Sequence, residues 1–128
     1  MQIYLPLNTA VDFDQSGSFA KALAQRLERE HPDRVVSKMT KSLRKGKVFV
    51  DWSQNNEHKT TVSVYSLRAK EEPTVSTPIR WQELERAFKK GDAAALVFSP
   101  EEALKRVRKS GDLFAPLLRL KQRLPKKF

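Results

Sequence analysis

A short basic stretch that ends in a carboxylate has the residue types of a metal- and phosphate-binding site. Residues 41–55 read KSLRKGKVFVDWSQN, so four cations precede three apolar residues and then Asp51. The apolar run at 48–50 predicts a buried strand. Because hard divalent cations take oxygen ligands, a carboxylate at a strand end can hold one, and neighbouring Lys and Arg side chains can hold phosphate. Metal and phosphate together indicate nucleotidyl transfer. A plainer interpretation also fits: a strand leaves the core at Asp51 among solvated lysines.

This stretch resembles the third catalytic motif of the polymerase domain of bacterial DNA ligase D, which belongs to the archaeo-eukaryotic primase superfamily. The resemblance runs from Gln2 to about Phe98, with a weaker tail behind it. It implies an α+β fold that forms the C-terminal half of a primase-like polymerase domain, with a mixed or antiparallel sheet and flanking helices. Other strings that resemble the family, in the same order, are residues 2–7, 28–34, 60–69 and 75–84.

The first two motifs of that family have no counterpart in the sequence. The first is a pair of acids spaced Asp-x-Asp, which supplies two of the three metal ligands and lies upstream of the matching region. The second, Ser-Gly-x-x-Gly-x-His, would end where residue 1 begins, and Gln2 stands where many members carry the His. We therefore expect this chain to be catalytically inactive by itself.

The resemblance implies a role for each polar residue of the motif. Asp51 matches the third catalytic acid and would give one ligand to a pair of divalent ions, Mn²⁺ or Mg²⁺. Lys41 and Arg44 resemble a basic pair near the incoming nucleotide and the template. Gln54 matches a polar active-site position, and Arg68 resembles a triphosphate ligand, although a surface cation after a strand fits Arg68 equally well. Further candidate nucleic-acid contacts are Lys38, Lys45 and Lys47.

The family implies a function in bacterial non-homologous end joining. Its polymerase domains extend broken DNA ends with nucleoside triphosphates before ligation, and they act in the cytoplasm beside the Ku protein and a DNA ligase domain. The family's 5′-phosphate pocket lies in the N-terminal half and is not expected here. One alternative is a non-catalytic basic module that binds nucleic acid. Another is a structural half that completes a separate subunit.

The composition agrees with a nucleic-acid partner. The chain has 25 Lys and Arg against 15 Asp and Glu, a net charge of +10, and clustered cations gain affinity for nucleic acid by releasing counterions. Residues 34–47 contain six cations and no acid, and residues 105–128 contain nine cations and one acid. A solubilising surface explains the second cluster equally well. The absence of Cys excludes disulfides and thiolate metal sites. No apolar run approaches ~20 residues, so no membrane partner is expected.

We expect one unit over residues 1–128, with a core over 1–98 and a basic helical tail over 99–128. The strand before Asp51 should be central, because it is apolar on both faces. An edge of the sheet left open could pair with a second copy of the chain. Trp52 and Tyr65 could stack on bases, but core packing is the default for aromatic residues beside strands. The predicted strands are 2–7, 48–51 and 60–67, the last with a short helix as its alternative.

Helices are predicted from apolar spacing and from signals at their ends. Ser18 is a candidate N-cap after a polar loop at 12–17, and the apolar stripe of that helix is Phe19, Leu23 and Leu27. Ser99-Pro-Glu-Glu has the residues of a helix start, and Gly111 suits the end. The predicted helices cover 18–30, 81–88, 100–110 and 112–124.

Overall fold

The computed structural model describes residues 1–125, and their contacts group into two compact units. The first unit comprises Met1–Pro6 and Val62–Leu120. The second comprises Leu7–Thr61 and Lys121–Phe128. Residues 126–128, which include two lysines of the predicted basic tail, lie outside the described part. Each unit combines helices with a two-stranded sheet, which confirms the α+β class.

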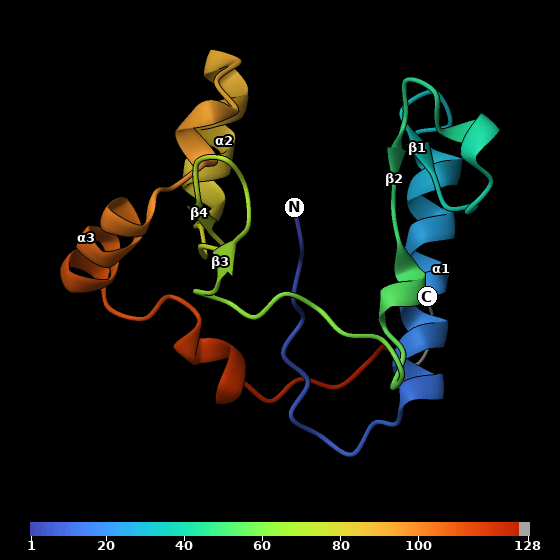
Figure 1. Ribbon diagram of the computed structural model, residues 1–128. Helices are drawn as coiled ribbons and strands as arrows, with labels where there is room; N and C mark the ends of the chain where they lie inside the picture. The colour runs from blue at the N-terminus through green and yellow to red at the C-terminus, as the bar shows by residue number, and fades with distance from the viewer. Residues whose placement is uncertain (126–128) are drawn as a thin grey trace. The chain divides into compact units, whose positions relative to one another are not determined.

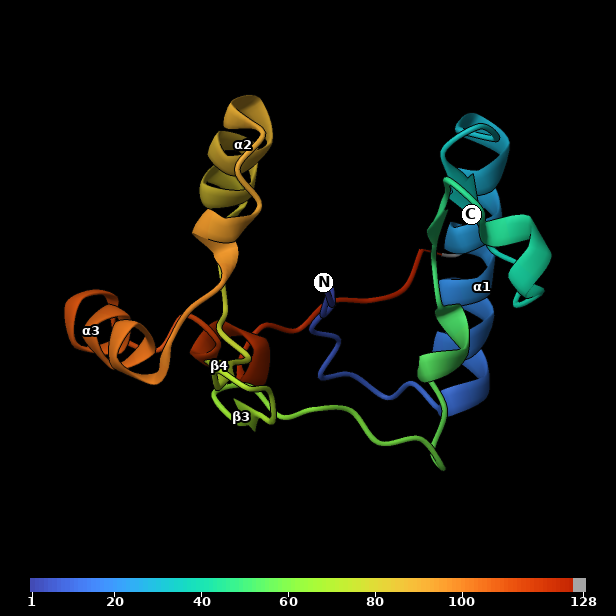
Figure 2. The ribbon, with the colours of Figure 1, turned by 45° about the horizontal axis from the view of Figure 1, so that its top comes forward.

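The second unit is built on one long helix that lies beside a small parallel sheet (Figures 1 and 2). The sheet residue Val36 and the helix residue Ala24 are buried, at 2% and 0% exposure, and form the centre of the packing. The buried side of the helix is displaced from the predicted apolar stripe of Phe19, Leu23 and Leu27, because Leu23 is 37% exposed. The elements are α1 (Phe13–Glu30), β1 (Val35–Val36), the 3₁₀ turn η1 (Lys41–Arg44), β2 (Val48–Phe49) and the 3₁₀ turn η2 (Trp52–Gln54).

Helix α1 begins at Phe13, within the stretch predicted to be a polar loop. Asp12 accepts a hydrogen bond from the Gln15 backbone N–H at 2.7 Å, and the Gln15 side chain accepts one from the Asp12 N–H at 3.3 Å. This reciprocal capping satisfies two free donors, which offsets the ~0.5–1 kcal/mol cost of Gly17 in the first turns. The prediction of a start at Ser18 was wrong, because the capping box of Asp12 and Gln15 starts the helix within the polar stretch.

Strand β2 is shorter and more exposed than the predicted central strand at 48–51. It pairs in parallel with β1 over two residues, in the register Val35–Val48 and Val36–Phe49. Within residues 1–125 it has no second strand partner, and Val48 remains 66% exposed. A strand becomes central only when both its edges are paired, so β2 keeps one open edge in this chain.

The first unit contains an antiparallel hairpin and two helices whose ends match the predictions. The Ser99 hydroxyl accepts from the Glu102 N–H at 3.2 Å, and the Glu102 carboxylate accepts from the Ser99 N–H at 2.8 Å. Gly91 ends the preceding helix with a positive φ of 65°, which glycine adopts at little cost. The elements are β3 (Leu67–Arg68), β4 (Thr74–Val75), α2 (Trp81–Lys90), the 3₁₀ turn η3 (Ala94–Leu96), α3 (Pro100–Ser110) and the 3₁₀ turn η4 (Ala115–Leu118).

Three predicted elements are absent or shortened. Residues 2–7 form no strand, because no described segment pairs with them in a ladder. Of the predicted strand at 60–67, only Leu67 is in a strand. The predicted helix at 112–124 is reduced to η4. Beyond it, the Gln122 main chain bonds to distant partners instead of its own helical turn: its N–H donates to the Leu7 carbonyl at 2.8 Å, and its carbonyl accepts from the Thr9 hydroxyl at 2.9 Å.

An ion pair joins α2 to α3 in the first unit. The Arg106 guanidinium donates to both Glu83 carboxylate oxygens, at 2.6 and 3.0 Å, and to the Pro78 carbonyl at 3.2 Å. It also lies over the Phe98 ring, 4.5 Å from the ring centroid. Both charged side chains are about one-fifth exposed. The pair is therefore partly desolvated and bidentate, which makes it stronger than a surface salt bridge.

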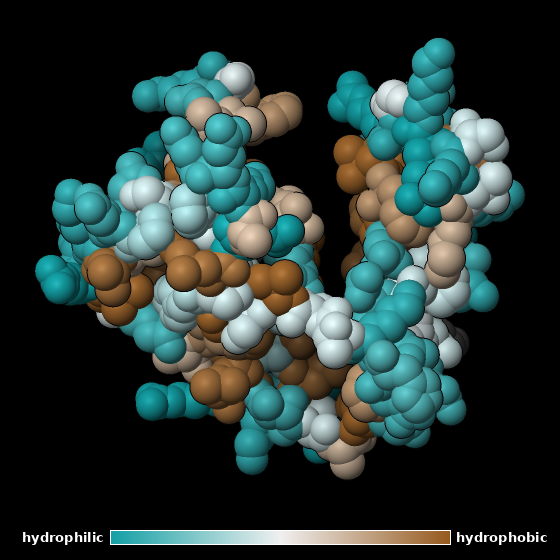
Figure 3. Space-filling view, viewed as in Figure 1, coloured by the Kyte–Doolittle hydropathy of each residue, from teal (hydrophilic) through white to brown (hydrophobic). Residues whose placement is uncertain are grey.

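Apolar side chains remain exposed in both units. No large side chain among residues 1–125 is completely buried, and brown apolar surface is visible in Figure 3. Exposed apolar area of this extent is typical of a surface that contacts another polypeptide. No helix in the described part is long and apolar enough to cross a bilayer. The most exposed large side chains away from the chain start and end are Phe88 (85%), Leu118 (73%), Val48 (66%), Leu67 (64%) and Trp81 (63%).

The ion pair between Arg106 and Glu83 predicts that the free energy of unfolding falls at acid pH. Arg106 lowers the pKa of Glu83 from 4.5 to about 2. Because the folded-state pKa lies below the unfolded value, the stabilisation is present above pH 4.5 and is lost as the pH falls toward 2. The shift corresponds to at most ~3 kcal/mol. In thermal unfolding monitored from pH 6 to pH 2, Glu83→Gln should remove this part of the pH dependence. Glu85→Gln, at an exposed position of the same helix, is the control, and equal pH profiles for the two variants would contradict the prediction.

Candidate metal and phosphate site

Asp51 follows β2 and caps the turn η2. Its Oδ1 accepts hydrogen bonds from the Ser53 N–H at 3.1 Å and from the Ser53 hydroxyl at 2.7 Å. The Gln54 amide donates to Oδ2 at 3.4 Å. These bonds occur because an Asp side chain readily accepts from the backbone two residues on. The carboxylate is thereby held at the start of η2 while its side chain remains exposed.

The surroundings of Asp51 favour its charged form. Partial burial opposes the charge, but hydrogen bonds from Ser53 and Gln54 and the charge of Lys59 outweigh that effect, so the pKa of Asp51 lies below its ordinary value. Lys59 reaches the turn directly, with its ammonium 2.7 Å from the Ser53 hydroxyl oxygen. The side chain is therefore an ionised oxygen donor at neutral pH, as a divalent cation requires.

The predicted basic residues before β2 divide into anchored and free side chains. Arg44 stacks over Phe49, 4.0 Å from the ring centroid, and donates to the Met39 carbonyl. The Lys47 ammonium donates to the Pro32 carbonyl at 2.6 Å. The exposed cations that make no hydrogen bond or ion pair with any residue in 1–125 are Lys38, Lys41 and Lys45.

The structure brings some of the predicted site residues together. Asp51 and Gln54 share a hydrogen bond, and Arg44 contacts Phe49, two residues before Asp51. Lys41 and Arg44 form the two ends of η1. Arg68 belongs to the first unit, where it is an exposed residue of β3, so the structure does not join it to the others. Four of the five predicted metal- and nucleotide-binding residues therefore belong to the second unit.

The residues present fit only part of a metal site. No cluster of three or more His, Cys, Asp or Glu side chains that could hold a metal ion occurs in residues 1–125. Asp51 offers carboxylate oxygens, and Ser53 and Gln54 beside it offer neutral ones. Hard divalent cations take about six oxygen ligands. This chain can therefore supply one charged ligand to such an ion and leaves the remaining positions to other groups.

Two residues that bond to Asp51 or to its turn, Ser53 and Lys59, were not among the predicted site residues. Ser53 had a readable signal, because Asp-x-Ser is a pattern in which the carboxylate accepts from the residue two positions on. Lys59 had no such signal in the sequence, because its partner Ser53 lies six residues away across an irregular loop.

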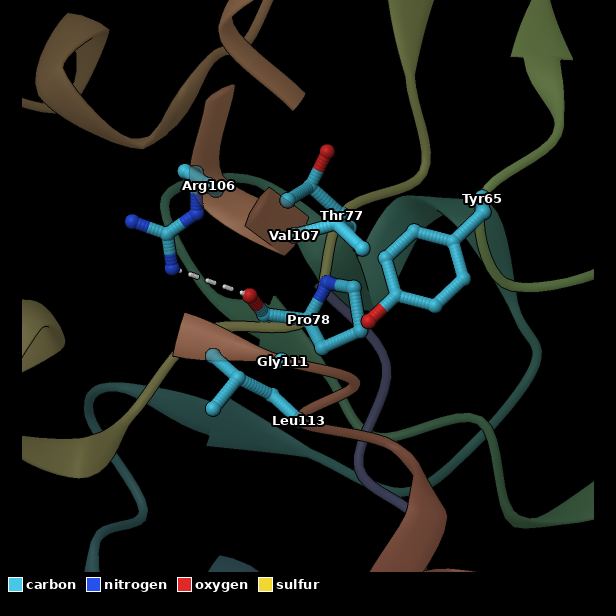
Figure 4. A pocket seen from close by; sticks show the side chains of 7 residues that line it. All are labelled: Tyr65, Thr77, Pro78, Arg106, Val107, Gly111 and Leu113. Atoms are coloured by element: carbon cyan, nitrogen blue, oxygen red, sulfur yellow. Dashed lines mark hydrogen bonds between the residues drawn. The ribbon is translucent and has the colours of Figure 1, made fainter. Parts of the chain in front are cut away.

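Asp51 does not line either of two hollows found among residues 1–125. In the first unit, a cavity of about 10 Å³ lies between Tyr65, Pro78 and Arg106 (Figure 4), a volume that suits one water molecule. Tyr65 beside it has a φ of +63° and donates its hydroxyl to Asp112 at 2.8 Å, so it packs within the unit, as the default for this residue predicts. In the second unit, a wide open hollow of about 840 Å³ lies between residues 8–11, α1 and residues 121–125.

Comparisons with known proteins identify the family of this chain. The family model described as "LigD, primase-polymerase domain" matches residues 1–114. The multifunctional non-homologous end joining DNA repair protein LigD of Mycobacterium tuberculosis is 46% identical over 117 residues, which cover 91% of this chain and 15% of that protein. The LigD protein of Mycolicibacterium smegmatis is 42% identical over the same shares. The chain thus spans about one-seventh of the curated relatives that it matches.

A solved structure has the same fold. The polymerase domain of Mycobacterium tuberculosis ligase D in complex with DNA superimposes with a TM-score of 0.78 and 47% sequence identity. The match covers 88% of this chain and 37% of that chain. The family model, the sequence relatives and the solved structure all indicate one assignment, and this chain belongs to the LigD primase-polymerase domain family.

Proposed function

We propose that this chain is part of a DNA repair polymerase that adds nucleotides to broken DNA ends in bacterial non-homologous end joining. The observation that carries the proposal is an ionised, exposed Asp51 at a strand end, preceded by the exposed Lys41 and Lys45, which make no hydrogen bond or ion pair within residues 1–125. The match to a polymerase domain bound to DNA supports it. Ku and a DNA ligase domain are the proposed protein partners, and the bacterial cytoplasm is the proposed location.

The side chains of the second unit suit separate tasks in this reaction. Asp51 would provide one ligand to a divalent ion, Mn²⁺ or Mg²⁺, which supplies charge stabilisation at the transferred phosphate. Arg44 is held against Phe49, so its guanidinium plane is ordered before a phosphate or base arrives. Lys41 is exposed and unpaired within residues 1–125, as a phosphate-binding ammonium must be.

The proposed activity needs residues beyond those of this chain. Two-metal catalysis uses several carboxylates, whereas only Asp51 is available at this turn. The chain covers 37% of the solved polymerase domain, and its exposed apolar residues, such as Phe88, suit contact with further protein. We therefore infer that nucleotide addition requires the polymerase domain that contains this chain.

A non-catalytic nucleic-acid-binding role is the second candidate, and the charge distribution favours it. The second unit has 14 Lys and Arg against 7 Asp and Glu, a net charge of +7, whereas the first unit has 11 against 8, a net charge of +3. Most of the positive charge therefore lies in the unit that contains Asp51. Phosphate binding by this unit requires no metal.

Self-association is a further proposal, because the sheets of both units have open edges within residues 1–125. Unpaired strand edges can pair with another copy of a chain. A sedimentation coefficient that rises with protein concentration would support pairing between copies, and a constant monomer value over a wide concentration range would contradict it.

Substitution of Asp51 tests the catalytic assignment. In the complete polymerase domain, Asp51→Ala should abolish template-dependent nucleotide addition with Mn²⁺ and leave DNA-end binding nearly unchanged. Since even groups outside the ligand shell of a metal contribute about 10- to 100-fold, we expect a loss of more than ~100-fold. Asp33→Ala, at an exposed carboxylate of the same unit, should retain full activity. Substantial addition by Asp51→Ala would exclude Asp51 as a metal ligand.

Substitution of Lys41 tests phosphate binding separately from catalysis. If Lys41 neutralises one phosphate, Lys41→Ala should lower the slope of log affinity against log salt concentration by ~0.9 for duplex DNA. The matched control is Lys90→Ala, at an exposed lysine of α2 in the other unit. The measurement is DNA binding by this chain in 50–200 mM salt, by fluorescence anisotropy. Equal slopes for wild type and Lys41→Ala would show that Lys41 contacts no phosphate.

A further inference from the structure

A buried serine lies at the centre of the second unit. Ser37 is 6% exposed and directly follows β1. Its hydroxyl donates to a Glu28 carboxylate oxygen at 2.5 Å, and its N–H is 3.3 Å from the same oxygen. Its carbonyl accepts from the Trp52 indole N–H at 3.1 Å. All the polar groups of this residue are therefore satisfied: two of its bonds end on Glu28 of α1 and the third on Trp52 of η2.

These bonds connect helix α1 to the turn that carries Asp51. Glu28 belongs to the last turns of α1, and Trp52 is the first residue of η2, immediately after Asp51. The Lys21 ammonium lies over the Trp52 ring, 5.1 Å from its centroid. The indole is thus held at its edge by Ser37 and at its face by α1, which leaves it little freedom to rotate.

The other end of η2 is also attached to α1. The Asn55 side-chain amide donates to the Ser16 hydroxyl at 2.8 Å. The Asn55 backbone carbonyl oxygen lies close to Gly17 of α1, 3.4 Å from where a Cβ would stand if residue 17 had one. Asp51 itself bonds only to Ser53 and Gln54 of its own turn among the described residues. The direction of its carboxylate therefore depends on how η2 is fixed to the helix.

The bond to Glu28 is the strongest link of this series. An ionised acceptor makes a hydrogen bond roughly twice as strong as a neutral one. The Ser37 hydroxyl lowers the pKa of Glu28, with further contributions from Lys38 and Lys47, so the carboxylate is charged at neutral pH. Loss of this acceptor would leave the buried Ser37 donors unsatisfied, which is costly in a low-dielectric interior.

We propose that Glu28, Ser37 and Trp52 form a positioning network that orients the Asp51 carboxylate for metal binding. The proposal rests on the proposed function, because it assigns no chemistry to these residues except through Asp51. A simpler role is also testable: the same bonds could stabilise the fold without affecting the direction of the carboxylate. The two roles differ in whether the geometry at Asp51 changes while the protein remains folded.

The first test measures geometry without metal or activity. In the complete polymerase domain, hydrogen exchange by NMR would report the Ser53 amide, which donates to Asp51 Oδ1. Glu28→Ala should accelerate its exchange by about 2- to 10-fold, as loss of one hydrogen bond implies. Glu28→Gln keeps an acceptor for Ser37 and should restore most of the protection. Glu30→Ala, on the same helix but bonded to the exposed Arg26, is the matched control and should have no effect.

The second test measures Mn²⁺ binding by the same variants through electron paramagnetic resonance. Glu28→Ala and Trp52→Phe should each weaken Mn²⁺ affinity by about 2- to 10-fold, with Glu28→Gln and Glu30→Ala close to wild type. Trp52→Phe keeps an aromatic ring while it removes the indole N–H donor to Ser37, so it decides the question if Glu28→Ala fails to fold.

The outcomes separate this inference from the proposed function. Unchanged Ser53 exchange and Mn²⁺ affinity in folded Trp52→Phe, with only a lower melting temperature, would overturn the positioning role. If Asp51→Ala is inactive in the same series, the proposed function still stands in that case. If Asp51→Ala binds Mn²⁺ and adds nucleotides like the wild type, both proposals are wrong.

Discussion

The hydrogen bond from the Trp52 indole to the Ser37 carbonyl is the constraint on which the second unit depends. It joins the turn after β2 to the end of β1, and Ser37 in turn bonds to Glu28 of α1. A two-residue parallel ladder gives little stability by itself. The helix and the buried serine therefore hold the strand ends in register. Asp51 has a defined place because it lies between β2 and the residue that makes this bond.

The Asp51 carboxylate is a negative charge surrounded by positively charged side chains. Hydrogen bonds from Ser53 and Gln54 stabilise the carboxylate, and Lys59 adds a positive charge nearby. The cations of η1 differ in their contacts: Arg44 is stacked on Phe49, whereas Lys41 makes no hydrogen bond or ion pair within residues 1–125. An ordered guanidinium suits recognition of a planar or bidentate group, whereas a free ammonium suits a phosphate that approaches from solvent. A polymerase and a simple nucleic-acid-binding module would both use such a surface, and only metal-dependent chemistry needs Asp51.

The single carboxylate at the candidate metal site and the exposed apolar side chains have a common explanation: the chain matches only part of the solved polymerase domain. The solved LigD polymerase domain is matched over 37% of its chain. Residues such as Phe88 and Val48, which are largely exposed here, have the character of buried positions. A metal site assembled from several segments and a core shared between them would both be partial in this chain.

Sequence alone determined the elements whose signals are local. The Ser99 capping box and Gly111 marked the two ends of α3, and these ends were correctly predicted because capping involves residues within one turn. The family also followed from sequence, because its motif around Asp51 is contiguous. The Asp12 capping box was equally local, but residues 12–17 were interpreted as a polar loop and its signal was missed.

Only the tertiary structure decided the features that depend on distant partners. Residues 2–7 formed no strand because no described segment pairs with them in a ladder. The helix predicted at 112–124 was reduced to η4, and beyond it Gln122 bonds to Leu7. The roles of Ser37, Glu28 and Lys59 were unreadable for the same reason, since each depends on contacts made through folding. Helix caps are satisfied within the local chain, whereas strand pairing and buried polar bonds require groups that folding brings together.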